Sequence, residues 1–179
     1  PFHPTILPGR LLNLNAAQYR VRPAEGLHPT WDEVLAHLGT DIDDAAKATP
    51  ELTEVGIDGP GYLRAWIARL LRFPFVPLPY LFFFGGTNCG KSTFADAIRD
   101  YLLVGGCVDA GGALTEIFNG QLENAILAYI EEMNVGAKHL AKLKAWVTEN
   151  TMPIRRMRTD QYTVPNLLHW VHTANSADA

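Results

Sequence analysis

Residues 85–92 form a glycine-rich run that ends in lysine and serine, Gly85-Gly86-Thr87-Asn88-Cys89-Gly90-Lys91-Ser92, with Thr93 directly after it. Glycines allow the backbone N–H groups of such a run to turn inward around a phosphate. Lys91 can then reach the β- and γ-phosphates of a nucleotide, and the Ser92 hydroxyl can ligate Mg²⁺. The pattern is typical of a Walker A loop and predicts a site for a nucleoside triphosphate. The alternative is a chance pattern in a glycine-rich turn.

Two acids and an asparagine follow apolar runs further along the chain. Glu131 and Glu132 come 40 residues and more after Lys91. A carboxylate at a strand end can hold Mg²⁺ and a second one can polarise the attacking water, so we assign Glu131 to the metal and Glu132 to the base role. Asn175 follows the run 167–174 and can orient that water or contact the γ-phosphate. The alternatives are a pair of solvated acids and an asparagine that favours a strand-end turn.

Charge is distributed unevenly along a chain whose net charge is −4. Six basic residues and one acid, Glu149, lie between 138 and 158; the basic residues are Lys138, Lys142, Lys144, Arg155, Arg156 and Arg158. Such residues can neutralise nucleic-acid phosphates, and a hairpin can project its tip into a channel. The alternative is a solvated helix face followed by a basic hairpin.

The apolar pattern predicts the elements that must position these residues. Three apolar runs end in polar residues, as central strands of a parallel sheet do; they span 80–84, 125–130 and 167–173. Helical spacing predicts helices over 62–72, 92–103 and 137–149. Loose alternation over 154–164, with a turn near Thr159-Asp160, predicts a hairpin. This order is typical of an α/β fold with a mostly parallel sheet flanked by helices, which binds ligands at the carboxyl ends of its strands.

The N-terminal part has a different composition. Residues 1–60 predict a small, mainly helical and irregular segment, a collar or linker, in front of a P-loop domain over 61–179. Within it we expect a short strand at 10–14, and a helix that a capping box at Thr30-Trp31-Asp32-Glu33 opens and that runs to Leu38. A linker with a helical turn should follow over 39–60. Nine acids and one lysine between 24 and 60 argue against DNA binding there.

Composition limits the class of protein. With 47% hydrophobic and 19% charged residues the chain has an ordinary globular balance. The apolar stretch 73–84 is too short to span a bilayer, and prolines interrupt it, so we expect no membrane association. Cys89 and Cys107 are expected to be reduced thiols, as in the cytoplasm of a bacterial cell or of a phage-infected host. No cysteine or histidine cluster has the spacing of a zinc site.

Taken together, these motifs resemble those of the superfamily 3 helicases, and within them the helicase domains of phage and plasmid primase-type replication proteins. Walker A, an acidic pair, a lysine-rich helix, a basic segment and a strand ending in asparagine come in that group's order and spacing. Lys144-Ala145-Trp146-Val147-Thr148-Glu149, followed by Ile154-Arg155-Arg156, resembles its additional motif before the sensor asparagine. Residues 167–175 resemble its motif C. The resemblance covers 61–179, and more weakly 1–60.

The resemblance implies an AAA+-like ATPase that forms a ring, usually a hexamer, hydrolyses Mg-ATP at subunit interfaces and draws one DNA strand through its pore. It implies replication partners, among them a primase domain. The roles it carries over are phosphate and Mg²⁺ binding by Lys91 and Ser92, Mg²⁺ and water activation by Glu131 and Glu132, the sensor by Asn175, and the DNA loop or interface by Lys144, Arg155, Arg156 and Arg158.

The sequence departs from the family pattern at three places. The first residue of the acid pair, the Walker B motif of P-loop proteins, is Glu131, where many of these proteins have aspartate. Residues 149–153 replace the glycine-rich turn of the additional motif. The family's arginine finger lies after motif C, whereas the sequence ends four residues after Asn175. We therefore expect a helicase core truncated at its C-terminal end, or another arginine in the finger's place.

Two other functions fit parts of the pattern. A small-molecule kinase also uses a Walker A loop, but it needs a lid, and no lid-like arginine-rich insertion is present. A nucleotide-binding switch or assembly scaffold, with little hydrolysis, would explain a missing arginine finger. Turnover with and without single-stranded DNA discriminates among the three.

Overall fold

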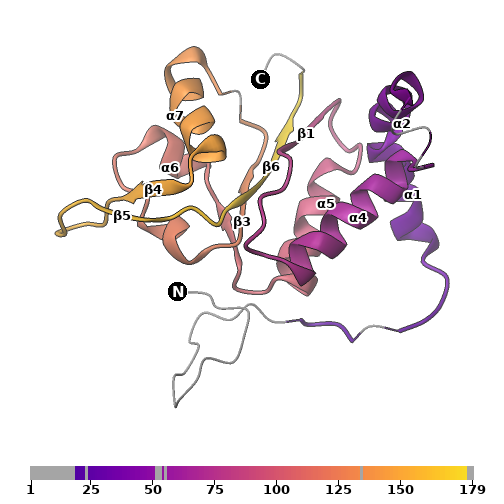
Figure 1. The fold of residues 1–179 in the computed structure, drawn as a ribbon, viewed down its shortest axis with the longest axis horizontal. Helices are drawn as coiled ribbons and strands as arrows, with labels where there is room; N and C mark the ends of the chain where they lie inside the picture. Colours follow the sequence, from indigo (N-terminus) through magenta and orange to yellow (C-terminus); the bar gives the residue numbers. More distant parts are fainter. Residues whose placement is uncertain (1–18, 23, 51–53, 55, 134, 177–179) are drawn as a thin grey trace. The chain divides into compact units, whose positions relative to one another are not determined.

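The computed structural model describes residues 19–22, 24–50, 54, 56–133 and 135–176. Contacts between residues divide the chain into two units. One comprises Arg22–Phe73, and the other comprises Pro1–Val21 and Pro74–Ala179. Figure 1 traces both along the sequence. The strand expected at residues 10–14 lies outside the described residues.

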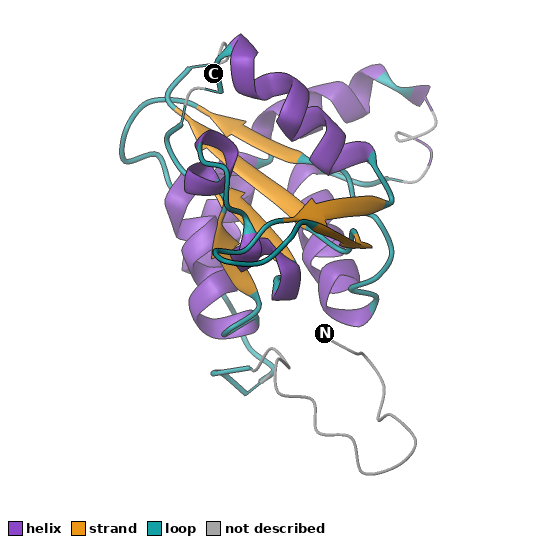
Figure 2. Cartoon of the chain, turned by 90° about the vertical axis from the view of Figure 1, so that its left-hand side faces the viewer, coloured by secondary structure: helices purple, strands orange, loops and turns teal. Residues whose placement is uncertain are grey.

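A four-stranded parallel sheet forms the centre of the larger unit. Its strands are β1 (Leu81–Phe84), β2 (Cys107–Asp109), β3 (Leu127–Ile130) and β6 (His169–Ala174), in the order β1-β6-β3-β2. Figure 2 draws the strands as orange arrows. The three apolar runs expected to form strands are β1, β3 and β6. Since all strands of the sheet are parallel, their carboxyl ends meet at one edge.

Helices cover both faces of this sheet, which is why its central strands are apolar on both sides. On one face, the Phe83 ring of β1 lies 5.2 Å from the Phe94 ring of α5 (Lys91–Ala97). On the other face, Trp170 of β6 stacks on Trp146 of α7 (Ala137–Thr148), with ring centroids 6.2 Å apart. The α/β fold predicted from the sequence is therefore confirmed.

Short elements around the sheet differ from the prediction. The helix expected over 92–103 ends as an α-helix at Ala97 and continues as a π-helical turn, η1 (Ile98–Leu102). The edge strand β2, which begins at Cys107, was not predicted because it is too short to show a pattern. The helix α6 (Gly111–Thr115) and the 3-10 turn η2 (Gly120–Asn124) were not predicted.

The predicted hairpin is confirmed, but its strands extend beyond the predicted range of 154–164 at both ends. β4 (Thr151–Ile154) pairs antiparallel with β5 (Tyr162–Pro165). The helix α7 leads into it, as the pattern of 137–149 predicted. Met152 and Ile154 of β4 are buried in the same apolar cluster as Trp146 and Trp170, which anchors the hairpin to the sheet.

The smaller unit is a cluster of helices: α1 (Pro29–Leu38), α2 (Thr40–Ala48) and α4 (Gly59–Arg72), with both α1 and α2 in contact with α4. The amphipathic helix expected at 62–72 thus begins three residues earlier. Asp58 caps it by accepting a hydrogen bond from the Gly61 N–H at 2.7 Å. The division into 1–60 and 61–179 stays a prediction.

Two expectations for this unit were wrong. No capping box opens α1: its N-cap is His28, which makes no side-chain cap bond, and Thr30 lies inside the helix. Pro29 at the first position favours this start because its φ is already helical. The linker expected over 39–60, with a helical turn, instead contains the nine-residue helix α2. Within the described part of the chain, no helix has the length and apolar character needed to cross a membrane.

Candidate functional site

The predicted phosphate-binding loop connects β1 to α5 and has the backbone conformation that its glycines allow. Gly85 has φ +152° and Gly90, the N-cap of α5, has φ +87°, both rarely adopted by residues with a side chain. A Cβ placed on Gly86 or Gly90 would meet no atom within 4 Å. The backbone of the loop therefore faces open space at these two positions, as a cradle for a phosphate group requires.

Lys91 places its charge inside this loop. Its side chain is 5% exposed. The ammonium donates hydrogen bonds to the Gly85 and Gly86 carbonyl oxygens, both at 2.7 Å, and lies 3.3 Å from Cys89 Sγ. These neutral partners hold the cation in place without cancelling its charge, so it can still attract an anion.

The order of the strands brings the other predicted residues to the same edge. The Gly85 N–H donates to the Ala174 carbonyl at 3.2 Å, and Asn175 comes directly after that acceptor. On the other side of β6, the Glu132 N–H lies 3.4 Å from Thr173 Oγ1. The first loop glycine, the acid pair and Asn175 thus lie at the ends of three adjacent strands.

Both acids and Asn175 are exposed to solvent at this edge. Tyr129, two residues before Glu131, contacts Arg99 of η1, with the guanidinium 5.6 Å from the ring centre. Among the described residues, no group of three or more Asp, Glu, His or Cys side chains could hold a metal ion. The Ser92 hydroxyl and the Glu131 carboxylate are oxygen donors of the kind that Mg²⁺ binds, commonly together with the phosphates of its substrate.

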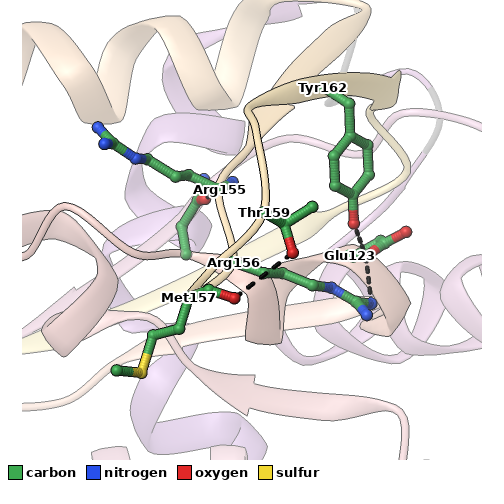
Figure 3. A network of polar contacts seen from close by, with 7 residues as sticks. Glu123, Arg155, Arg156, Met157, Thr159 and Tyr162 are labelled. Atoms are coloured by element: carbon green, nitrogen blue, oxygen red, sulfur yellow. Dashed lines mark hydrogen bonds and ion pairs between the residues drawn. The ribbon is translucent and has the colours of Figure 1, made fainter.

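Some of the basic residues bind other parts of the protein, whereas others are exposed to solvent. Lys142 donates hydrogen bonds to the Ala113 and Leu114 carbonyls at 2.7 and 3.2 Å, and so caps the C-terminal end of α6. Arg156 forms an ion pair with Glu123, which also accepts a hydrogen bond from the Tyr162 hydroxyl at 2.6 Å (Figure 3). These contacts give Lys142 and Arg156 structural partners, whereas the side chain of Lys144 is exposed.

The tip of the hairpin presents a different surface. Arg158 has φ +59°, and Met157 beside it is 70% exposed. Figure 3 shows Arg155 extending away from Arg156, on the opposite side of the hairpin. The Arg155 guanidinium lies 5.9 Å from the centre of the Phe118 ring, a cation–π distance.

Phe118 is a candidate residue that was not identified from the sequence. It is 38% exposed beside the basic hairpin, in the loop between α6 and η2. An aromatic ring next to arginines is suited to stack on a base of a single strand. The only signal in the sequence was a large aromatic residue in a short stretch without strand or helix periodicity.

Comparison with solved structures identifies the fold. Three structures of the C-terminal region of NrS-1 are similar to this chain. An apo structure covering 305–718 has a TM-score of 0.64 and 20% identity over 87% of this chain. An A form apo structure gives 0.63 and 21% over 87%, and another gives 0.61 and 20% over 88%. This chain spans about a third of the length of each, 35 to 36%.

The comparison with protein families covers the residues of the candidate site. No curated protein matches the chain. A family model described as a family of unknown function, DUF5906, matches residues 83–179. This range holds the phosphate-binding loop, the acid pair, the hairpin and Asn175, and it makes up more than half of the sequence. The chain belongs to the DUF5906 family.

Proposed function

We propose that this domain binds Mg-ATP and hydrolyses it as the motor of a replication helicase. It acts on single-stranded DNA as a hexameric ring of identical subunits. The observation that carries the proposal is the position of β6 between β1 and β3, because it brings the Walker A loop, the acid pair and Asn175 to one edge of the sheet. The similarity to the C-terminal region of NrS-1 supports the fold that such a motor needs.

Each residue at that edge has a role in this proposal. The loop amides and Lys91 hold the β- and γ-phosphates, and Ser92 and Glu131 ligate Mg²⁺, which neutralises charge on the phosphates. Glu132 accepts a proton from the attacking water, and Asn175 orients that water. The remaining charge on the transferred phosphate calls for an arginine from a neighbouring subunit, which is why turnover should depend on assembly.

The proposed DNA contact is the hairpin face with Arg155, Arg158 and Phe118, together with Lys144 of α7. Arginine and lysine neutralise backbone phosphates, and the ring supplies a stacking surface that does not depend on base identity. Arg156 is also among the residues expected to contact DNA, but its ion pair with Glu123 makes attachment of the hairpin its first role.

The test is steady-state Mg-ATP hydrolysis against protein concentration, with and without a single-stranded oligonucleotide. This chain and a version extended past Ala179 are compared with Lys91→Ala. The matched control is Lys47→Ala, which removes a lysine whose side chain is 75% exposed in α2. We expect turnover that rises with concentration and with DNA, and that falls at least about a hundredfold in Lys91→Ala only.

The other outcomes point to the other functions. Turnover in the extended chain alone places the arginine finger beyond residue 179. Tight ATP binding without turnover in either version, and without a DNA effect, leaves a nucleotide switch or scaffold. Phosphate transfer to a small molecule in the absence of DNA identifies a kinase. Each of the last two results overturns the motor proposal.

A further inference from the structure

The segment that follows β3 is held by two neighbouring residues of β6, from opposite faces of the sheet. His172 Nε2 lies 2.8 Å from the Met133 carbonyl oxygen. Thr173 Oγ1 lies 3.4 Å from the Glu132 N–H and 3.5 Å from the Ile130 carbonyl oxygen. His172 and Thr173 are each 2% exposed. The backbone on both sides of the Glu132 side chain is therefore bonded to buried side chains of β6.

The hydrogen bonds of His172 define its tautomer. A carbonyl oxygen only accepts, so Nε2 carries the hydrogen that the Met133 carbonyl receives. The other nitrogen, Nδ1, then accepts from the Tyr80 hydroxyl at 2.8 Å. Burial lowers the pKa of His172, which favours this neutral form. The resulting chain of two hydrogen bonds runs from Tyr80, the residue before β1, through β6, to the segment after β3.

Glu132 needs such support because of its backbone. Its φ is +47°, in the left-handed region that residues with a Cβ adopt only when their surroundings hold them there. The two bonds to β6 act on the N–H of Glu132 and on the carbonyl of the next residue. They hold the backbone that carries this carboxylate against relaxation to an ordinary strand conformation.

We propose that His172 and Thr173 are positioning residues that hold the Glu132 carboxylate in line with the phosphate-binding loop. This inference rests on the proposed function, in which Glu132 is the base. Tyr80 completes the arrangement, because its hydroxyl links the strand that ends in the loop to the segment that carries the acid. None of the three side chains touches the nucleotide in this proposal, so they act on turnover and not on ATP affinity.

The test uses conservative pairs in the extended chain. Thr173→Val removes the hydroxyl and keeps the shape, whereas Thr173→Ser keeps the hydroxyl. His172→Gln keeps a donor near Nε2, whereas His172→Asn keeps a polar group only near Nδ1. We expect kcat to fall about tenfold to a hundredfold in Thr173→Val and His172→Asn, with KM for ATP within about twofold. Thr173→Ser and His172→Gln should recover most of kcat.

A second measurement does not need turnover. Amide hydrogen exchange of the peptide containing Glu132 should be about tenfold faster in Thr173→Val than in the parent or in Thr173→Ser. Equal exchange in all three, or native kcat in Thr173→Val and His172→Asn, overturns the positioning role. If the extended chain without substitutions hydrolyses no ATP, the proposed function fails. The exchange rates still decide whether β6 holds the segment that contains Glu132.

Discussion

Lys91 and Lys142 are both lysines whose ammonium groups bind backbone carbonyls, yet their surroundings differ. Lys91 lies in a loop in which Gly86 and Gly90 face open space, so its charge is available to a ligand. Lys142 is enclosed between the end of α6 and the Trp146 ring, whose centre lies 4.7 Å from Nζ. A basic residue in the sequence therefore does not by itself identify a contact for DNA.

This difference predicts that substitution of only one of two lysines on the same helix affects stability. Lys142→Met leaves carbonyls of α6 without a charged donor and should lower the free energy of unfolding by about 2 kcal/mol. Lys144→Met, two positions on and exposed, should change it by less than about 0.5 kcal/mol. Urea denaturation of both variants measures this. Equal stabilities would show that the α6 carbonyls gain nothing from Lys142.

Phe118 and Arg155 should act on DNA together. Phe118→Ala removes a stacking surface and should weaken binding to a single-stranded oligonucleotide about tenfold, with little change in the salt dependence. Arg155→Ala should weaken it similarly and also lower the salt slope, because a phosphate contact is lost. Fluorescence anisotropy at several salt concentrations separates the two effects.

The control for both is Arg64→Ala, which removes an exposed arginine of α4 that pairs with Asp32. It should leave the affinity within about twofold. Unchanged binding in Phe118→Ala and Arg155→Ala would remove this hairpin face from the proposed DNA path.

Among the elements, those with a strong apolar pattern were predictable. The strands β1, β3 and β6, the helix α7 and the hairpin all follow runs or spacings that burial requires. The missed elements have no such requirement. The strand β2 has three residues, and α2 is polar, with Asp43 accepting from the Gly59 N–H at 2.6 Å. Contacts distant in sequence stabilise them, and a local pattern does not record such contacts.

Two buried histidines of the strand β6 should make the stability of the protein depend on pH. It carries His169 and His172, and burial lowers the pKa of both. In the unfolded chain these groups titrate near 6.5. As pH falls through that value the unfolded state binds protons that the native state does not, so the free energy of unfolding should decrease.

Urea denaturation at about pH 7.5, 6.5 and 5.5 measures this effect. His172→Gln should reduce the slope, since one of the two groups is gone. The carboxyl group of Asp100 should not add to this change in stability between about pH 7.5 and 5.5, because hydrogen bonding to Arg99 lowers its pKa below the usual range. Stability that is the same at all three pH values would contradict a neutral, buried histidine pair.

At the scale of the whole molecule, the candidate site depends on the order of the strands. The sequence showed polar residues after three apolar runs, and these could have lain at separate places along a sheet. Only the pairing of β6 with both β1 and β3 makes them neighbours. Strand order follows from how helices pack across the sheet, and no single residue specifies it. The candidate residues could therefore be named from the sequence, whereas their juxtaposition could not.

Because the chain divides into two units, a destabilising substitution in one unit should lower the stability of that unit and leave the other intact. In the unit of Arg22–Phe73, Gly39 after α1 touches Gly59 at the start of α4: a Cβ on Gly59 would lie 2.0 Å from the Gly39 carbonyl oxygen. Backbone cannot yield as a flexible side chain does. Gly59→Ala should therefore separate α1 from α4 and destabilise this unit by about 3 kcal/mol.

Hydrogen exchange resolved by peptide locates that loss. In Gly59→Ala, protection should fall in α1 and α4, while β1, β3 and β6 keep theirs, because each unit has its own contacts. Gly112→Ala makes the same chemical change in α6 of the other unit, where a Cβ meets nothing within 4 Å, and should leave exchange unchanged throughout. If Gly59→Ala exposes the sheet as well, the chain unfolds as one cooperative body, and ATP binding should then be lost in this variant together with the helices.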